Sequence, residues 1–187
     1  MQIKSKENII DYFNDGIKKN LSIGVENEKF LFETKSNQRA NYNKVRQVLE
    51  LLKNKFNWGE IKEGENLIGL KLDGKSITLE PGNQIELAGD KLENIHKVCS
   101  ESYAFQEQLE KVCKEIGLKT LSIGYDPFTN LKNVPHNPKQ RYKLMTAEMP
   151  KNGELSLNMM YQTSGTQINL DYFSEDDFIK KFKLISY

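Results

Sequence analysis

Two glutamates, Glu26 and Glu28, stand two positions apart in GVENEKFLF, residues 24–32, a stretch that otherwise has the composition of a buried strand. Side chains of a strand alternate between its two faces, so both carboxylates point the same way, together with Phe30 and Phe32. Carboxylates placed side by side repel each other, and neighbouring phenyl rings remove part of their water. A bound metal ion is the usual compensation, so this stretch predicts a cation site.

Further acidic and amide side chains occur in two other stretches with the composition of strands. ITLEPGNQIELAG, residues 77–89, contains Glu80 just before a Pro-Gly turn and Glu86 between two apolar residues. In TSGTQINLDY, residues 163–172, polar and apolar side chains alternate. If these strands lie beside the first, one face of a sheet presents a set of oxygen-bearing side chains: Glu26, Glu28, Glu86, Gln167 and Asn169, with Glu80 at its edge.

The ligand types in this set favour a hard cation. All are oxygen donors, which suit Mg²⁺, whereas zinc sites use Cys or His ligands that the set lacks. Protein-bound Mg²⁺ usually has phosphate among its other ligands, so ATP-dependent chemistry follows as a hypothesis. The alternative is a solvated sheet face, which is the commoner explanation for a single Glu-x-Glu pair and for the alternating Gln167 and Asn169.

These motifs need a sheet to bring them together, and the hydrophobic pattern predicts one with helices packed on one side. Asp73-Gly74 suits a tight hairpin turn, and Gly117 suits a helix C-cap. Strands and helices do not alternate regularly and no Gly-rich phosphate loop occurs, so the sequence predicts an α+β fold with a mostly antiparallel sheet. We expect helices at 5–19, 44–56, 91–116, 141–149 and after Ser174, and strands at 21–34, 66–82 (as a hairpin), 83–89, 118–125 and 161–172, with irregular structure at 126–140.

Whole-chain properties argue against several kinds of partner. The chain has 187 residues and a formal net charge of +1, which gives no reason to expect nucleic acid or an anionic membrane. No stretch has the length and apolarity of a membrane span, and the N-terminus lacks the features of a secretory signal, so we expect a cytoplasmic protein. Cys99 and Cys113 fall in one predicted helix about 21 Å apart along its axis. That separation excludes a disulfide, so we expect two buried free thiols.

Five motifs in a fixed order make the sequence recognisable: GVENEKF, LEPGNQIELAG, SIGYDPF, PKQRYKLM and YQTSGTQINLDY. Together they resemble the plant and proteobacterial type of glutamate–cysteine ligase, over about residues 20–182. The resemblance implies the fold of a wider group of carboxylate–amine ligases that includes glutamine synthetase, in which a curved, largely antiparallel sheet forms a funnel with helices on its outer face. Because this type of enzyme is considerably longer, we expect residues 1–187 to form the N-terminal part of a single catalytic domain.

The resemblance also implies a reaction and roles for individual residues. ATP phosphorylates the γ-carboxylate of L-glutamate, and the amine of L-cysteine attacks the acyl phosphate to give γ-glutamylcysteine, the first step of glutathione biosynthesis. Catalytic roles are implied for Glu28 and for Arg141, whose forked N–H groups would grip the α-carboxylate of glutamate. The implied Mg²⁺ ligands are Glu26, Glu28, Glu80, Glu86 and Gln167, and the implied amino-acid pocket is lined by Arg141, Tyr142, Met145, Thr163 and Asn169.

Other interpretations stay open at this point. Asn27 stands where many relatives have histidine, and a single arginine such as Arg141 is more often a surface residue. The chain could belong to a carboxylate–amine ligase that uses another amine, or it could be a truncated chain that binds ligand without catalysis. Since much of the implied ATP site is expected beyond residue 187, we expect the 187-residue chain alone to be inactive. The sequence leaves the oligomeric state open.

Overall fold

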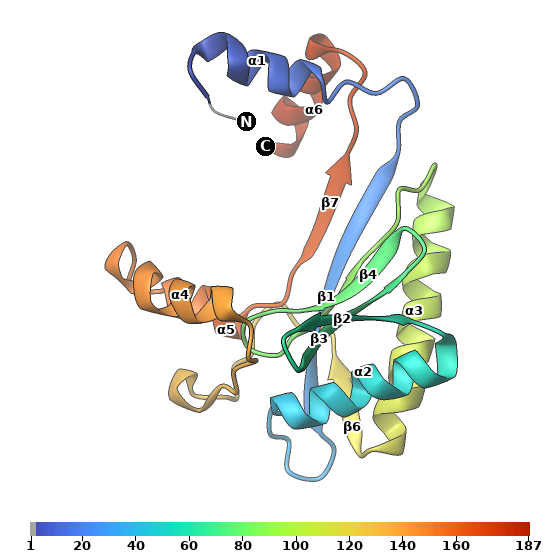
Figure 1. The fold of residues 1–187 in the computed structure, drawn as a ribbon, viewed down its shortest axis with the longest axis vertical. Helices are drawn as coiled ribbons and strands as arrows, with labels where there is room; N and C mark the ends of the chain where they lie inside the picture. The colour runs from blue at the N-terminus through green and yellow to red at the C-terminus, as the bar shows by residue number, and fades with distance from the viewer. Residues whose placement is uncertain (1–2) are drawn as a thin grey trace.

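The computed structural model describes residues 3–187 and contains a seven-stranded sheet whose paired strands are all antiparallel (Figure 1). The central strand is β1 (Ile23–Glu33). Its first part pairs with β5 (Ile85–Ala88) and with β7 (Thr166–Leu170), and its last part pairs with β6 (Leu118–Leu121). The predicted α+β class with an antiparallel sheet is confirmed. Beyond β5 the sheet continues through β4 (Lys75–Leu79), β3 (Asn66–Leu72) and β2 (Gly59–Glu63).

Two helices cover one face of this sheet and enclose the main hydrophobic core (Figure 1). α2 (Tyr42–Phe56) and α3 (Ile95–Glu115) begin after Asn41 and Asn94, whose side chains accept hydrogen bonds from first-turn amides. Such a cap favours a helix start at the next residue, which is why α3 begins later than the predicted residue 91. The core combines the apolar sides of these helices with one face of the strands, and includes Leu31, Val45, Val48, Leu49, Leu52, Leu67, Leu70, Ile77, Leu79, Ile85, Leu87, Leu109 and Val112.

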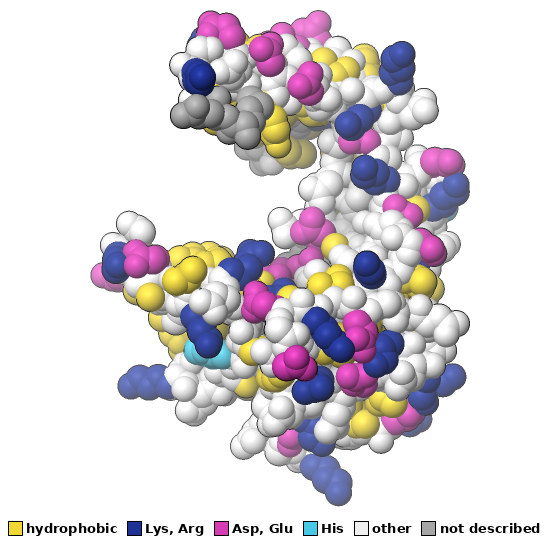
Figure 2. Space-filling view, viewed as in Figure 1, with side chains coloured by type: hydrophobic (Ala, Val, Ile, Leu, Met, Phe, Trp, Pro, Cys, Tyr) yellow, Lys and Arg dark blue, Asp and Glu magenta, His cyan; other side chains and the backbone are white. Residues whose placement is uncertain are grey.

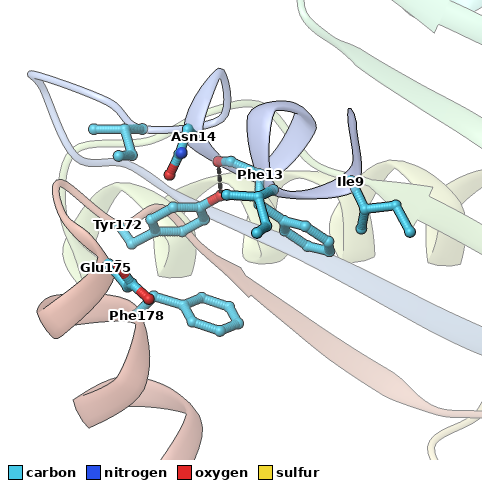
Figure 3. Close-up of a pocket in the computed structure, with 8 residues that line it drawn as sticks. Ile9, Phe13, Asn14, Tyr172, Glu175 and Phe178 are labelled. Carbon is cyan, nitrogen blue, oxygen red and sulfur yellow. Dashed lines mark hydrogen bonds between the residues drawn. The ribbon is translucent and has the colours of Figure 1, made fainter. Parts of the chain in front are cut away.

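The first and last helices pack on each other at one end of the molecule, away from the main core (Figure 1). They are α1 (Lys6–Asn14) and α6 (Glu175–Ile185). The ring of Phe13 lies against that of Phe178, with centroids 6.4 Å apart, and the hydroxyl of Tyr172 donates to the backbone carbonyl of Phe13 (Figure 3). α1 fully buries none of its side chains, so these few apolar contacts are what holds it.

The remaining helices lie to one side of the sheet. α4 (Gln140–Glu148) and α5 (Ser156–Gln162) are accompanied by two short 3₁₀ turns, Leu131–Asn133 and Met149–Lys151. Figure 2 shows a wide hollow between these helices and the terminal pair, α1 and α6, with acidic side chains exposed along its wall. Within residues 3–187, none of the helices combines the length and apolarity needed to cross a membrane.

Several local predictions are wrong. β2 was not expected, because its sequence GEIKE is short and charged; pairing with β3 makes it an edge strand. The predicted strand 161–172 begins as the end of a helix, because Tyr161 packs into a small apolar cluster, and it becomes a strand only from Thr166. Of the two thiols predicted to be buried, Cys113 is buried as part of the main core, whereas Cys99, nearer the start of α3, is exposed.

Candidate functional site

Three carboxylates meet on the face of the sheet that α2 and α3 leave uncovered. Glu28 on β1 is the direct cross-strand partner of Glu86 on β5. Glu80 follows the end of β4, and each of the three residues offers an oxygen within 4.8 Å of the others. The directly opposed positions in an antiparallel pair bring side chains closest, so this geometry follows from the β1–β5 register.

The electrostatics of this carboxylate cluster (Glu28, Glu80 and Glu86) show that its negative charge is poorly compensated. Burial and the neighbouring carboxylates of Glu80, Glu26 and Glu28 raise the pKa of Glu86 to about 7. Burial also raises the pKa of Glu28, although its carboxylate accepts a hydrogen bond of 2.9 Å from the amide of Gly165. Carboxylates that must share a small, partly desolvated volume favour either a proton or a bound cation.

Glu26 lies beside the carboxylate cluster, in a separate polar arrangement. Its two oxygens accept hydrogen bonds from the side-chain amides of Gln167 (3.0 Å) and Asn169 (3.1 Å) on β7. Glu26 and Gln167 are register partners across β1 and β7. The closest group of carboxylates thus includes Glu80, from the turn after β4, and Glu26 lies beside it. A metal-ligand role for Glu26 remains a prediction.

A buried arginine, Arg39, organises the surroundings of the site. Its guanidinium forms an ion pair of 3.0 Å with Asp126, both side chains being almost fully buried, and lies 4.3 Å from the ring centroid of Phe30. It also donates to the backbone carbonyls of Gly82, in the turn after Glu80, and Tyr161. Arg39 is one of only three arginines in this lysine-rich chain, and that rarity suggests a need for the forked guanidinium, but the sequence predicted no specific role for it.

Comparison with known proteins decides the family. A model described as glutamate–cysteine ligase family 2 matches residues 22–187. The chain belongs to this family. The resemblance inferred from the five motifs is therefore confirmed, and the family is one of ligases.

Curated members of the ligase family from plants are similar along nearly all of this chain. It is 41% identical over 181 residues to the chloroplastic glutamate–cysteine ligase of Medicago truncatula, covering 96% of this chain and 36% of that protein. Glutamate–cysteine ligase A of Oryza sativa subsp. japonica is 42% identical, with 96% and 37% covered, and the Nicotiana tabacum ligase is 40% identical, with 96% and 35% covered. The chain thus spans little more than a third of the length of these relatives.

The predicted cytoplasmic location is wrong on this comparison. The Medicago, Oryza and Nicotiana ligases are all named chloroplastic, and this finding overturns the expectation of a cytoplasmic protein. The prediction rested on the absence of secretory and membrane features, and that absence does not distinguish the cytoplasm from an organelle.

The residues expected to line the amino-acid pocket of a ligase of this family are spread over several environments. The hydroxyl of Tyr142 lies 3.1 Å from Glu80 Oε1, and Asn169 bonds Glu26, so these two adjoin the acidic face. The side chain of Thr163 bonds back to Met159 O at the end of α5. Met145 packs instead beside the buried cluster of Val134, Met160 and Tyr161.

Arg141 lies on the first turn of α4 and is exposed. Its guanidinium lies 5.0 Å from the ring centroid of Tyr142 and forms no ion pair with any carboxylate of residues 3–187. The structure therefore places a charged, forked donor next to Tyr142, which itself contacts Glu80. A substrate role for Arg141 remains a prediction.

Proposed function

We propose that this chain supplies the metal-binding part of the active site of a glutamate–cysteine ligase, which joins the γ-carboxylate of L-glutamate to the amine of L-cysteine at the expense of ATP. The observation that supports this most directly is the carboxylate cluster of Glu28, Glu80 and Glu86 on the open face of the sheet. Membership of the ligase family gives this cluster its chemical context.

The donor set of the carboxylate cluster fits Mg²⁺. Its members are hard oxygen ligands from three different segments of chain. Burial and neighbouring carboxylates raise the pKa values of Glu28 and Glu86, and a cation would neutralise that crowded charge. When bound there, Mg²⁺ would supply charge neutralisation for the phosphoryl group of ATP during transfer. Glu28, Glu80 and Glu86 would hold it, while Gln167 and Asn169 fix the carboxylate of Glu26 beside it.

The proposed reaction has two steps, and both use reactants that carry negatively charged groups. The γ-carboxylate oxygen of glutamate forms a bond to the terminal phosphorus of ATP, and ADP leaves. The cysteine amine then bonds to the acyl carbon, loses a proton, and inorganic phosphate leaves with the electron pair of the broken C–O bond. Both substrates and ATP carry negative charge, so Arg141 on the rim is our candidate for the α-carboxylate of glutamate.

Metal binding by the chain itself tests the first part of the proposal. Mn²⁺ affinity of the 187-residue protein is measured by isothermal titration for wild type and for Glu28→Gln, Glu80→Gln and Glu86→Gln. Each substitution should weaken binding at least about tenfold, because a ligand charge is lost. Glu33→Gln, on the same strand but outside the cluster, is the control and should leave affinity unchanged; equal affinity in all variants would refute the metal site.

Transplantation tests the reaction. Residues 22–187 replace the matching segment of the Medicago truncatula ligase, and the chimera is assayed for ADP and γ-glutamyl product with glutamate and cysteine. Activity that Glu28→Gln in the transplanted segment abolishes supports the proposal. A folded chimera that releases phosphate with another amine but not with cysteine would favour the alternative amine substrate.

A further inference from the structure

Glu80 differs from its two partners in how it is positioned. Glu28 and Glu86 sit within paired strands, whereas Glu80 lies one residue past the end of β4, where the sheet no longer holds the backbone. The turn that follows is closed by hydrogen bonds between Glu80 and Gln84 and between Asn83 and Glu80. These bonds shape the turn, but they do not direct the carboxylate.

Residues 137–142, far from Glu80 in the sequence, form hydrogen bonds with Glu80 and with the residue before it. The side-chain amide of Asn137 donates to the carbonyl of Glu80. The ammonium of Lys139 donates to the carbonyl of Leu79 at 2.7 Å, and the hydroxyl of Tyr142 lies 3.0 Å from that carbonyl and 3.1 Å from Oε1 of Glu80. Four hydrogen-bond contacts from residues 137–142 therefore converge on two consecutive residues.

The side chains that form these hydrogen bonds are buried, so loss of a bond would leave a polar group without a partner and without water. Lys139 is 9% exposed and Tyr142 is 3% exposed. The ammonium of Lys139 lies 5.3 Å from the ring centroid of Tyr142 and is attracted by Glu80 and Glu86, while burial lowers its pKa. It forms no salt bridge with residues 3–187, so its bond to the Leu79 carbonyl and its attraction to the cluster are what compensate the buried charge.

We propose that Lys139 and Tyr142 are positioning residues that hold Glu80 within the carboxylate cluster. Tyr142 orients the carboxylate of Glu80, and Lys139 fixes the backbone that precedes it and partly offsets the charge of the cluster. This assignment rests on the proposed metal site and moves Tyr142 from lining the amino-acid pocket to supporting a metal ligand. Groups that orient metal ligands without touching the metal commonly change affinity by ten- to a hundredfold.

The test uses the complete 187-residue chain with Tyr142→Phe and Lys139→Met, which keep shape and remove one polar group each. Lys143→Met, an exposed lysine of the same helix, is the control. We expect Mn²⁺ affinity to fall about tenfold in Tyr142→Phe and Lys139→Met and to stay unchanged in the control. In a Glu80→Gln background, Tyr142→Phe should cost little more, because the carboxylate that it orients is gone.

A metal-independent measurement separates this inference from the proposed function. Hydrogen exchange of a peptide covering residues 79–84 is followed without metal, and it should be faster in both variants while peptides of α2 and α3 keep wild-type rates. If wild type fails to bind Mn²⁺ but exchange at residues 79–84 is faster in both variants, the proposed function fails. The inference that Lys139 and Tyr142 hold Glu80 in place is then still supported. Wild-type exchange at 79–84 in both variants, or additive losses of affinity with Glu80→Gln, would overturn the inference.

Discussion

Glu28 and Glu86 face each other directly across β1 and β5, as register partners in the middle of an antiparallel pair. Like charges at such positions are destabilising unless something compensates them. With Glu80 added from the turn after β4, three carboxylates occupy a space in which their oxygens lie within 4.8 Å of one another. The strands thus hold an arrangement that costs stability in the metal-free chain, and the first two predictions concern that cost.

Glu86→Gln should stabilise the metal-free protein above neutral pH. Burial and neighbouring carboxylates raise the pKa of Glu86 from an ordinary 4.5 to about 7, so the folded chain holds this proton more tightly than the unfolded chain. Folding stability therefore falls as the pH rises from about 4.5 to about 7, and the loss is complete above that range. Glutamine never ionises, so in EDTA the melting temperature of the variant should exceed that of wild type more at pH 8 than at pH 5. An equal difference at both pH values would contradict the prediction.

Mg²⁺ should raise the melting temperature of wild type clearly more than that of Glu28→Gln. A ligand present at a hundred times its dissociation constant stabilises the folded state by about 2.7 kcal/mol, or roughly 5–10 °C for a chain of this size. Thermal unfolding is recorded in EDTA and after addition of Mg²⁺, with Glu33→Gln as the control that should respond like wild type. The site is excluded if wild type and Glu28→Gln shift alike.

Breaking the Arg39–Asp126 pair should be strongly destabilising. Both side chains are almost fully buried, so removal of one partner leaves an uncompensated charge and costs about 3–5 kcal/mol. Arg39→Met and Asp126→Asn are compared with the double variant by urea unfolding. Because the two act as a unit, the double variant should lose less than the sum of the single losses. Additive losses would show that the two side chains stabilise the fold independently.

Arg141→Lys should weaken glutamate binding, tested in the chimera in which residues 22–187 of this chain replace the matching segment of the Medicago truncatula ligase. Lysine keeps the charge and loses the parallel N–H pair that matches a carboxylate, at a cost of about 1.5–3 kcal/mol, or roughly ten- to a hundredfold in affinity. The measurement is the KM for glutamate beside the KM for ATP and the melting temperature. Because Arg141 is exposed, the fold should be unaffected; an unchanged KM for glutamate would remove Arg141 from the substrate site.

Phe178→Ala should loosen the terminal helix pair and leave the main core intact. The ring of Phe178 contacts Phe13 and Tyr172, and α1 has no fully buried side chain to hold it otherwise (Figure 3). Hydrogen exchange should become faster in α1 and α6, while α2 and α3, which enclose the main core, keep their rates. Faster exchange throughout the chain would instead make this contact part of the global fold.

Much of the local structure could be predicted from the sequence. The parity of Glu26 and Glu28, the Asp73-Gly74 turn and the Ser174 cap are properties of neighbouring residues, and the structure shows a strand, a hairpin and a helix start at these places. The alternation of Glu86 with Ile85 and Leu87 likewise places its carboxylate opposite the core. These features depend on short-range periodicity and on hydrogen bonds within a few residues.

Only the tertiary structure decides which of these groups meet. Glu80 joins Glu28 and Glu86 because of the strand register and because residues 137–142 form hydrogen bonds around it. Glu26 instead accepts a hydrogen bond from a side chain of β7. The burial of Arg39 depends on a carboxylate 87 positions away. Strand pairing and ion pairing over such separations are selected by the packing of the whole chain, and periodicity within one segment contains no record of them. The sequence by itself therefore determined that one face of the sheet carries oxygen-bearing side chains. The tertiary structure decided which of those side chains lie close enough together to form a site.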